Sequence, residues 1–123
     1  MFKNLLFIAI GGSLGAILRY VISINFIKYI PFKPHWATLL INAIGCFLIG
    51  IGIGYFNKTS GIDTTYKLLF ITGFCGSFTT FSTFGLENIQ LIQQNQIFNA
   101  VLYILLSVII GLLCVLAGLY TLK

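Results

Sequence analysis

The composition of this 123-residue chain excludes a soluble globular protein. Apolar residues make up 59% of the chain and charged residues 7%, whereas soluble domains average roughly 45–50% and 25%. The net charge is +5, but the basic residues are scattered and form no cluster that follows a phosphate backbone. We therefore predict an integral membrane protein, and not a cytosolic enzyme, a disordered chain or a nucleic-acid binder.

Four apolar segments are long enough to cross a bilayer as helices, because the hydrocarbon core requires about 20 helical residues. The predicted spans are residues 5–26, 36–56, 68–92 and 97–122. Tyrosine and tryptophan side chains near the ends of the spans are typical of an interfacial aromatic belt. These segments predict an all-α integral membrane fold, with residues 1–123 forming a single four-helix transmembrane domain.

Glycines in the first two spans predict close helix packing. Gly11 and Gly15 form one GxxxG pattern, and Gly50 and Gly54 form another. Small residues let helix backbones approach each other inside a membrane, where no hydrophobic effect drives association. The patterns indicate helix contacts and carry no more specific meaning.

The third span is predicted to break near its middle. Residues 73–84 contain two glycines among a run of serine and threonine, which makes a poor continuous helix. The segment from Lys67 to Gln93 would be about 40 Å long as a straight helix, which exceeds the roughly 30 Å core. A break near Gly76–Thr79 explains both features, and its freed carbonyl groups can bind a small cation. A kinked helix whose hydroxyl groups bond back to their own turn is the alternative.

Aromatic and hydroxyl side chains cluster just after the predicted break. Phe81 and Phe84 are three residues apart and therefore share one face of a helix. The edge of an aromatic ring is electropositive, so with the hydroxyl groups of Ser82 and Thr83 beside it such an edge can hold a dehydrated anion. Ordinary packing of the two rings is the alternative.

Polar residues also recur along the second and fourth spans. In the second span, Asn42 shares a face with Thr38. In the fourth span, a stripe repeats every four residues: Asn99, Tyr103, Ser107 and Gly111. No carboxylate is expected at the membrane midplane, because Glu87 lies toward the end of the third span. Tracks of hydrogen-bond donors without carboxylates favour an anion over a cation.

The basic residues are divided almost evenly between the two sides of the predicted bundle. The positive-inside rule therefore gives almost no preference for one orientation. One interpretation is that all copies insert in a single, weakly biased orientation. The other is that copies insert in both directions, so that two of them form an antiparallel dimer with inverted symmetry. The two sets are Lys3, Lys58, Lys67 and Lys123 on the side of the termini, and Arg19, Lys28 and Lys33 on the other.

Several motifs follow one another in a characteristic order. They are Gly11–Ala16 followed by Arg19-Tyr20, Thr38-Leu39 with Asn42, Gly45–Phe47 with Gly50, Gly73–Gly76, and Thr79–Phe84. Together they resemble the Fluc fluoride channels, the CrcB family, and the match covers all four spans in order. The third-span motif is long and specific.

This resemblance implies a passive, fluoride-selective channel and no enzymatic activity. Such a channel is an antiparallel, dual-topology homodimer in the inner (plasma) membrane. It lets cytoplasmic fluoride leave down its electrochemical gradient, which lowers fluoride toxicity. A central Na⁺ ion is held at the helix break by backbone carbonyl groups, which correspond here to Gly76 and Thr79 of both subunits.

The resemblance also implies roles for individual residues. It places Phe81 and Phe84, Asn42, and the hydroxyl groups of Tyr103 and Ser107 along the fluoride pathway, next to the Ser82 and Thr83 donors. Gly111 stands where some members continue this track with serine. Arg19 and Glu87 correspond to charged residues of a vestibule.

Two other functions remain as alternatives. A small dual-topology multidrug exporter also has four short helices, but it needs a membrane-embedded glutamate in the first span, where this chain has only Arg19. A structural membrane subunit without a substrate is the second alternative. The hydroxyl cluster at a predicted helix break argues against it.

Overall fold

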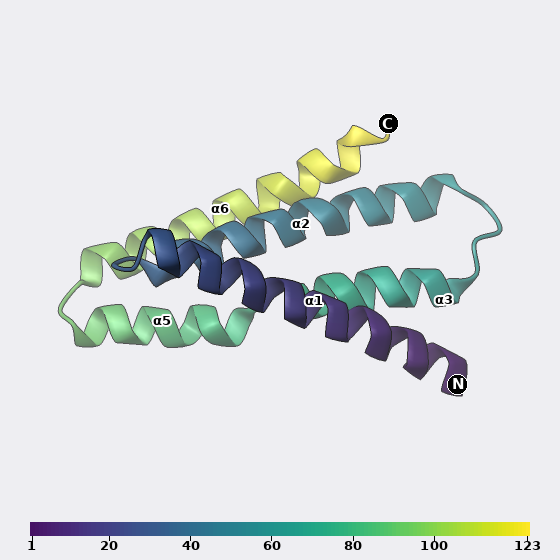
Figure 1. Ribbon diagram of the computed structural model, residues 1–123. Coiled ribbons are helices and arrows are strands. Elements are labelled where there is room, and N and C mark those ends of the chain that lie inside the picture. Colours follow the sequence, from purple (N-terminus) through teal and green to yellow (C-terminus); the bar gives the residue numbers. More distant parts are fainter.

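The computed structural model describes all residues from Met1 to Lys123, and every regular element is a helix. Four helical segments are long and apolar enough to cross a membrane. They alternate in direction, so that both termini lie at the same end of the bundle (Figure 1). The elements are α1 (Phe2–Tyr29), α2 (Pro34–Lys58), α3 (Thr64–Lys67), η1 (Leu68–Cys75), α4 (Gly76–Phe78), α5 (Phe81–Gln93) and α6 (Ile97–Thr121).

The first three helical segments extend a few residues beyond the predicted apolar spans, whereas the fourth ends at Thr121, one residue short of its predicted span. The second span starts at Pro34, whose fixed φ suits the first turn of a helix. The third starts at Thr64, because the Asp63 carboxylate caps the helix by accepting a hydrogen bond from the Thr65 N–H. Hydropathy therefore locates the membrane core, whereas Pro34 and the Asp63 cap mark where the second and third helical segments begin.

Asp63 also ties the start of α1 to the loop before α3. The Lys3 ammonium lies 2.8 Å from its carboxylate. This hydrogen bond, together with those from Thr65, holds the pKa of Asp63 well below its usual range. The stabilisation is therefore present at neutral pH and is lost in strong acid, where the carboxylate becomes protonated. Because the pair is exposed, it positions the loop more than it stabilises the fold.

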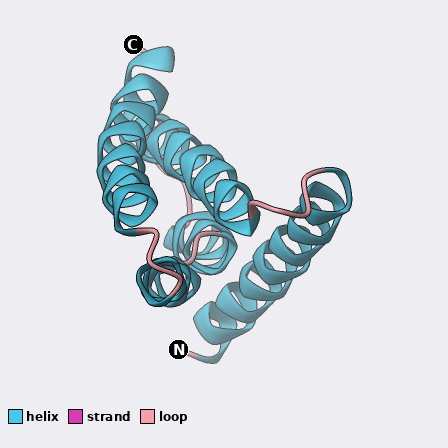
Figure 2. Ribbon diagram, turned by 90° about the vertical axis from the view of Figure 1, so that its left-hand side faces the viewer, coloured by secondary structure: helices cyan, strands magenta, loops and turns pink.

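Glycines decide which helices pack most closely. A Cβ atom at Gly11 or Gly15 would overlap a backbone carbonyl oxygen of the third span, so α1 lies directly on η1 and α4. A Cβ atom at Gly50 or Gly118 would likewise overlap a backbone carbonyl oxygen of the facing helix, so α2 and α6 pack closely and form the most extensive helix pair. The predicted close packing is confirmed, and the structure adds which helix each glycine faces. Figure 2 shows α1 set apart from the paired helices on the opposite side.

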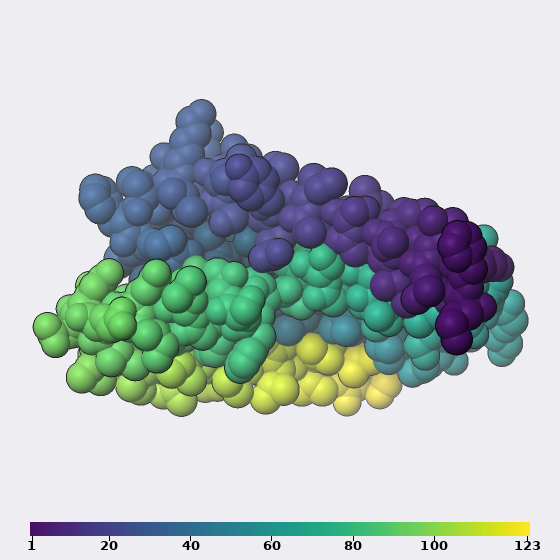
Figure 3. Space-filling view, turned by 90° about the horizontal axis from the view of Figure 1, so that it is seen from below, coloured from purple at the N-terminus to yellow at the C-terminus, as the bar shows by residue number.

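The fold leaves most apolar side chains on its surface. Only 18 of the 123 residues are buried, which fits helices whose solvent is lipid. The buried core is small and lies where α2, α5 and α6 meet: Leu39, Leu91, Ala100 and Tyr103. Seen from below, α1 lies along the first half of the third span, and α5 is exposed (Figure 3).

The first half of the third span is wound as a π-helix, a feature that we did not predict. Residues Leu68–Cys75 form i→i+5 hydrogen bonds. The looser winding directly precedes the break described below. Gly73, inside this segment, meets α1 so closely that a Cβ atom there would lie 2.8 Å from the Ile8 carbonyl oxygen.

Candidate functional site

The third span is interrupted at Thr79 and Thr80. Helix α4 ends at Phe78, Thr79 and Thr80 adopt extended conformations with ψ of 155° and 122°, and α5 begins at Phe81. Figure 1 shows the resulting separation between α5 and the preceding half of the span. A break near Gly76–Thr79 was predicted and is confirmed, with the unwound residues at the last position of that range, Thr79, and one residue beyond it, Thr80.

Asn42 on α2 binds the unwound backbone. Its Oδ1 accepts a hydrogen bond from the Thr80 N–H at 2.8 Å, and its Nδ2 donates to the Thr80 carbonyl at 3.1 Å. One side chain thus satisfies both backbone groups of a residue that has left the helix. The amide keeps a second N–H, which can bind another acceptor.

Thr80 in turn caps α5. Its Oγ1 accepts a hydrogen bond from the Thr83 N–H at 3.3 Å and donates to the Thr83 hydroxyl at 3.1 Å. The Ser82 hydroxyl lies 3.5 Å from the same oxygen. The predicted donors Ser82 and Thr83 are therefore grouped around a helix N-terminus.

The break leaves carbonyl groups without their usual helical partners. The Thr80 N–H, which would bond Gly76 in a continuous helix, donates to Asn42 instead. The Thr83 N–H, which would bond Thr79, donates to the Thr80 side chain. Neither carbonyl accepts any other backbone bond outside the regular helices. Two free carbonyl oxygens close together in the chain are suitable ligands for a hard cation such as Na⁺.

A groove of about 340 Å³ runs past the break, between α2, α5 and α6. It brings together most of the predicted site residues: Asn42, Gly76, Thr79, Phe81, Phe84 and Ser107. The Ser107 Oγ is buried and has no hydrogen-bond partner. The Phe81 side chain is 83% exposed, so the groove is open along one side of the chain.

Gly111 forms part of the groove where the polar stripe of α6 lacks a hydroxyl. A Cβ atom at this position would lie 3.5 Å from the Cys46 Sγ. The side chain of Cys46, which also lines the groove, therefore occupies the space beside Gly111.

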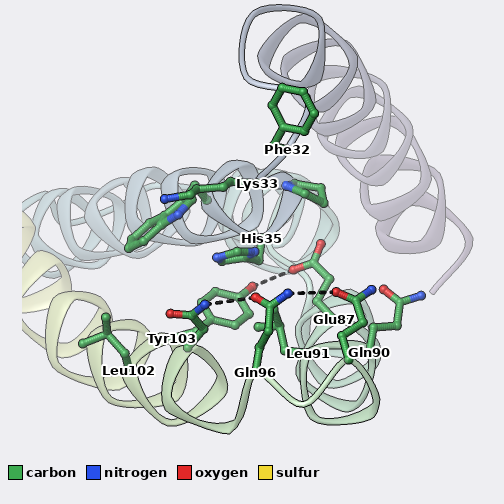
Figure 4. Close-up of a pocket in the computed structure, with 13 residues that line it drawn as sticks. Phe32, Lys33, His35, Glu87, Gln90, Leu91, Gln96, Leu102 and Tyr103 are labelled. Atoms are coloured by element: carbon green, nitrogen blue, oxygen red, sulfur yellow. Dashed lines mark hydrogen bonds between the residues drawn. The ribbon is translucent and has the colours of Figure 1, made fainter.

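A second, more polar pocket of about 230 Å³ opens at the end of the bundle where α2 begins. Here Glu87 is held by two hydroxyl groups, since Thr38 donates to Oε1 at 2.7 Å and Tyr103 donates to Oε2 at 2.8 Å. Figure 4 shows His35 above the Tyr103 ring, with Glu87 and Gln96 both to the right of the ring. We refer to this pocket as the polar mouth.

Aromatic rings separate the groove from the polar mouth. Phe84 lines the groove, and its ring centroid lies 5.1 Å from that of Tyr103, which lines the mouth. The His35 ring centroid lies 5.2 Å from that of Tyr103, and the two rings are tilted by 58°. Tyr103, predicted on the same track as Ser107, thus lies beyond the groove, and only 1% of its surface is exposed.

Three predicted site residues line neither pocket: Ser82 and Thr83, which lie at the start of α5, and Arg19. Arg19 is the most distant of them along the chain. It lies in the second half of α1, where its Nε is buried without a hydrogen-bond partner. Conversely, sequence reasoning did not foresee the contact of Thr38 with Glu87 or the position of His35. The sequence indicated that Thr38 and Asn42 share a helix face, but it did not indicate which residues of other helices that face contacts.

Comparison with known proteins identifies the family of this chain. Residues 6–119 match the family described as CrcB-like protein, Camphor Resistance (CrcB). The chain belongs to this family, as its motifs indicated.

Relatives share nearly the full length of the chain. A protein of Flavobacterium psychrophilum is 46% identical, over 98% of this chain and 98% of its own length. One of Azobacteroides pseudotrichonymphae is 42% identical, over 96% and 94%. One of Leptospira interrogans is 38% identical, over 98% and 95%. Each is named fluoride-specific ion channel FluC.

The Asn42 contact predicts a specific loss of stability. Asn42→Ala leaves the Thr80 N–H and carbonyl unpaired, which should cost about 1–3 kcal/mol for each buried group. Thermal melting of the purified protein in detergent measures the effect. Asn25→Ala is the control, because Asn25 bonds only the Val21 carbonyl of its own helix. Equal melting temperatures for the two variants would contradict the role of Asn42.

Proposed function

We propose that this chain forms a fluoride-specific ion channel and catalyses no reaction. Fluoride leaves the cytoplasm passively through it, down the electrochemical gradient, across the inner (plasma) membrane. The groove carries the proposal, because it combines aromatic ring edges and unpaired hydrogen-bond donors and lacks a carboxylate. The names of the relatives support the same substrate.

Fluoride is small and strongly hydrated, so its water shell must be replaced during passage. In the groove, the Phe81 and Phe84 rings have centroids 5.7 Å apart and provide electropositive edges. The second N–H of Asn42 and the unpaired hydroxyl of Ser107 provide hydrogen bonds. Thr83 and Ser82 extend the set of donors at the start of α5.

The polar mouth continues the proposed pathway. The Tyr103 and Thr38 hydroxyl groups bond Glu87, so an arriving anion competes with this carboxylate for the same protons. We assign Glu87 and Arg19 to the entrances, where partial hydration makes a charge tolerable. Arg19 attracts anions, and Glu87 opposes them unless its hydroxyl partners shield it.

The open side of the groove supports an antiparallel, dual-topology homodimer in which each subunit contributes one four-helix transmembrane domain. An exposed Phe81 beside an anion pathway requires a cover that excludes lipid. A second copy supplies one with the same surface, as in other isologous dimers. The even distribution of basic residues allows both orientations.

The same dimer would bring two helix breaks together. We propose that a Na⁺ ion is held there by the carbonyl oxygens of Gly76 and Thr79 from both subunits. The ion would supply the positive charge that satisfies unwound backbone within the membrane. The free state of these carbonyl groups supports this assignment.

A multidrug exporter is less well supported. The first span carries Arg19 and no carboxylate, and Glu87 is held by Thr38 and Tyr103 instead of facing an open substrate site. A structural subunit would not need the groove.

Replacing the rings tests the proposed pathway directly. Phe81→Ile and Phe84→Ile keep an apolar side chain and remove the ring edge, so each should reduce fluoride flux at least about tenfold, which corresponds to 1.4 kcal/mol in the barrier. Fluoride efflux from liposomes, read with an electrode, is the measurement. Phe2→Ile is the control, because its exposed ring lies at the start of α1, away from the groove. Parental flux in both ring variants would rule out the ring-edge pathway.

Charge at the entrance is tested in the same assay. Arg19→Gln should slow fluoride efflux by lowering the local anion concentration, and the ratio of fluoride to chloride flux should stay unchanged. A variant that conducts chloride as readily as fluoride would place Arg19 in the selective part of the pathway instead.

Dual topology is tested by labelling single cysteines at opposite ends of the bundle. Ser60→Cys and Phe32→Cys are introduced into a chain whose own three cysteines are replaced by alanine. If copies insert both ways, a membrane-impermeant reagent should label about half of each in intact cells. Complete labelling of one position and protection of the other would show a single orientation.

Sodium binding is tested by thermal melting in Na⁺ against choline. The parent should melt at a higher temperature in Na⁺, and Gly76→Val should lose this difference because bulk beside the carbonyl groups blocks the ion. Gly85→Val is the matched control, since nothing lies within 4 Å of a Cβ atom there. Identical Na⁺ responses in the two variants would argue against the site.

A further inference from the structure

A groove of about 470 Å³ lies between the ends of α2 and α6 and has no part in the proposed fluoride pathway. Its apolar lining consists of Leu116, Leu119 and Leu122. Its lining also includes two lysines, Lys58 and Lys123, together with other polar side chains. Figure 1 shows these helix ends next to each other at the end of the bundle that holds both termini.

Both lysine ammonium groups are held in place. The Lys58 Nζ donates to the Leu122 carbonyl at 2.8 Å, which joins the end of α2 to the end of α6. The Lys123 Nζ lies 4.2 Å from the centroid of the Tyr120 ring, a cation–π contact. An ammonium group has three N–H donors, so each lysine keeps donors for a further acceptor.

The charge of this groove is not balanced by an acidic side chain. The two carboxylates of the chain lie elsewhere, since Asp63 pairs with Lys3 and Glu87 with Thr38 and Tyr103. If Lys123 carried a main-chain carboxylate, its single negative charge would still be exceeded by the two ammonium groups, and the groove would stay positively charged. The groove therefore favours an anionic occupant.

We propose that this groove binds the headgroup of an anionic phospholipid. The phosphate would accept hydrogen bonds from Lys58 and Lys123, and an acyl chain would lie along the three leucines. Basic pockets between transmembrane helices at the membrane surface suit such headgroups. The leucine-lined part distinguishes the lipid from free phosphate, because a small inorganic anion makes no use of apolar surface. The inference does not depend on fluoride conduction.

Native mass spectrometry of the purified full-length protein tests the inference. Phosphatidylglycerol should remain bound to the parent, whereas phosphatidylcholine should not compete. The double variant Lys58→Gln/Lys123→Gln should bind phosphatidylglycerol about 30-fold more weakly, because each lysine near an anionic headgroup contributes about fivefold. Lys67→Gln is the matched control, since Lys67 belongs to α3, which lies at the same end of the bundle (Figure 1), and does not line the groove.

Three results would overturn the inference. The first is equal lipid binding by the double variant and the parent. The second is a loss of lipid binding in Lys67→Gln as large as that in the double variant, and the third is displacement of the lipid by millimolar inorganic phosphate. The second would mean that overall charge attracts the lipid, and the third that the groove recognises any phosphate. Circular dichroism of each variant verifies that the helices are retained, so that a loss of lipid reports on the groove.

Discussion

The pair of hydrogen bonds between Asn42 and Thr80 is the constraint on which the site depends. A backbone residue that leaves its helix inside a membrane has no water to bond, and each unpaired group costs several kcal/mol. Asn42 supplies both missing partners from a neighbouring helix. Because Thr80 is held there, its side chain is placed to start α5, and the groove forms between the break and α6.

The same need to pair polar groups applies to the polar mouth. Glu87 is the one carboxylate within the spans, and it is satisfied by hydroxyl groups from two different helices. Those contacts hold Tyr103 against Phe84, so that aromatic rings lie between the groove and the polar mouth. A proposed anion pathway thus passes from ring edges and neutral donors to a region where donors already serve a carboxylate. Charge is kept toward the ends, where hydration is available.

Much of this arrangement was predictable from local chemistry. The glycine and hydroxyl run indicated a break, and the spacing of Phe81 and Phe84 indicated a shared face, because both depend on neighbours along the chain. The groove then brought Phe81 and Phe84 together with Asn42 and Ser107 from other helices. The π-helix of residues 68–75 was not predicted; it is the part of the third span that packs against α1, a contact between segments far apart in the chain. Arg19 illustrates the same limit: its charge was evident, but its surroundings were not.

The sequence by itself determined the membrane class, the four spans, the break and the family, because composition, hydropathy and contiguous motifs are local properties. Only the tertiary structure decided which groups meet across helices. Asn42, predicted as a pathway donor, also bonds the backbone of Thr80. Glu87 accepts hydrogen bonds from Thr38 and Tyr103. The tertiary structure also brought Lys58 to the end of α6. The physical reason is that an unpaired polar group in a membrane takes its partner from whichever helix packs beside it, and helix packing is set by the whole chain.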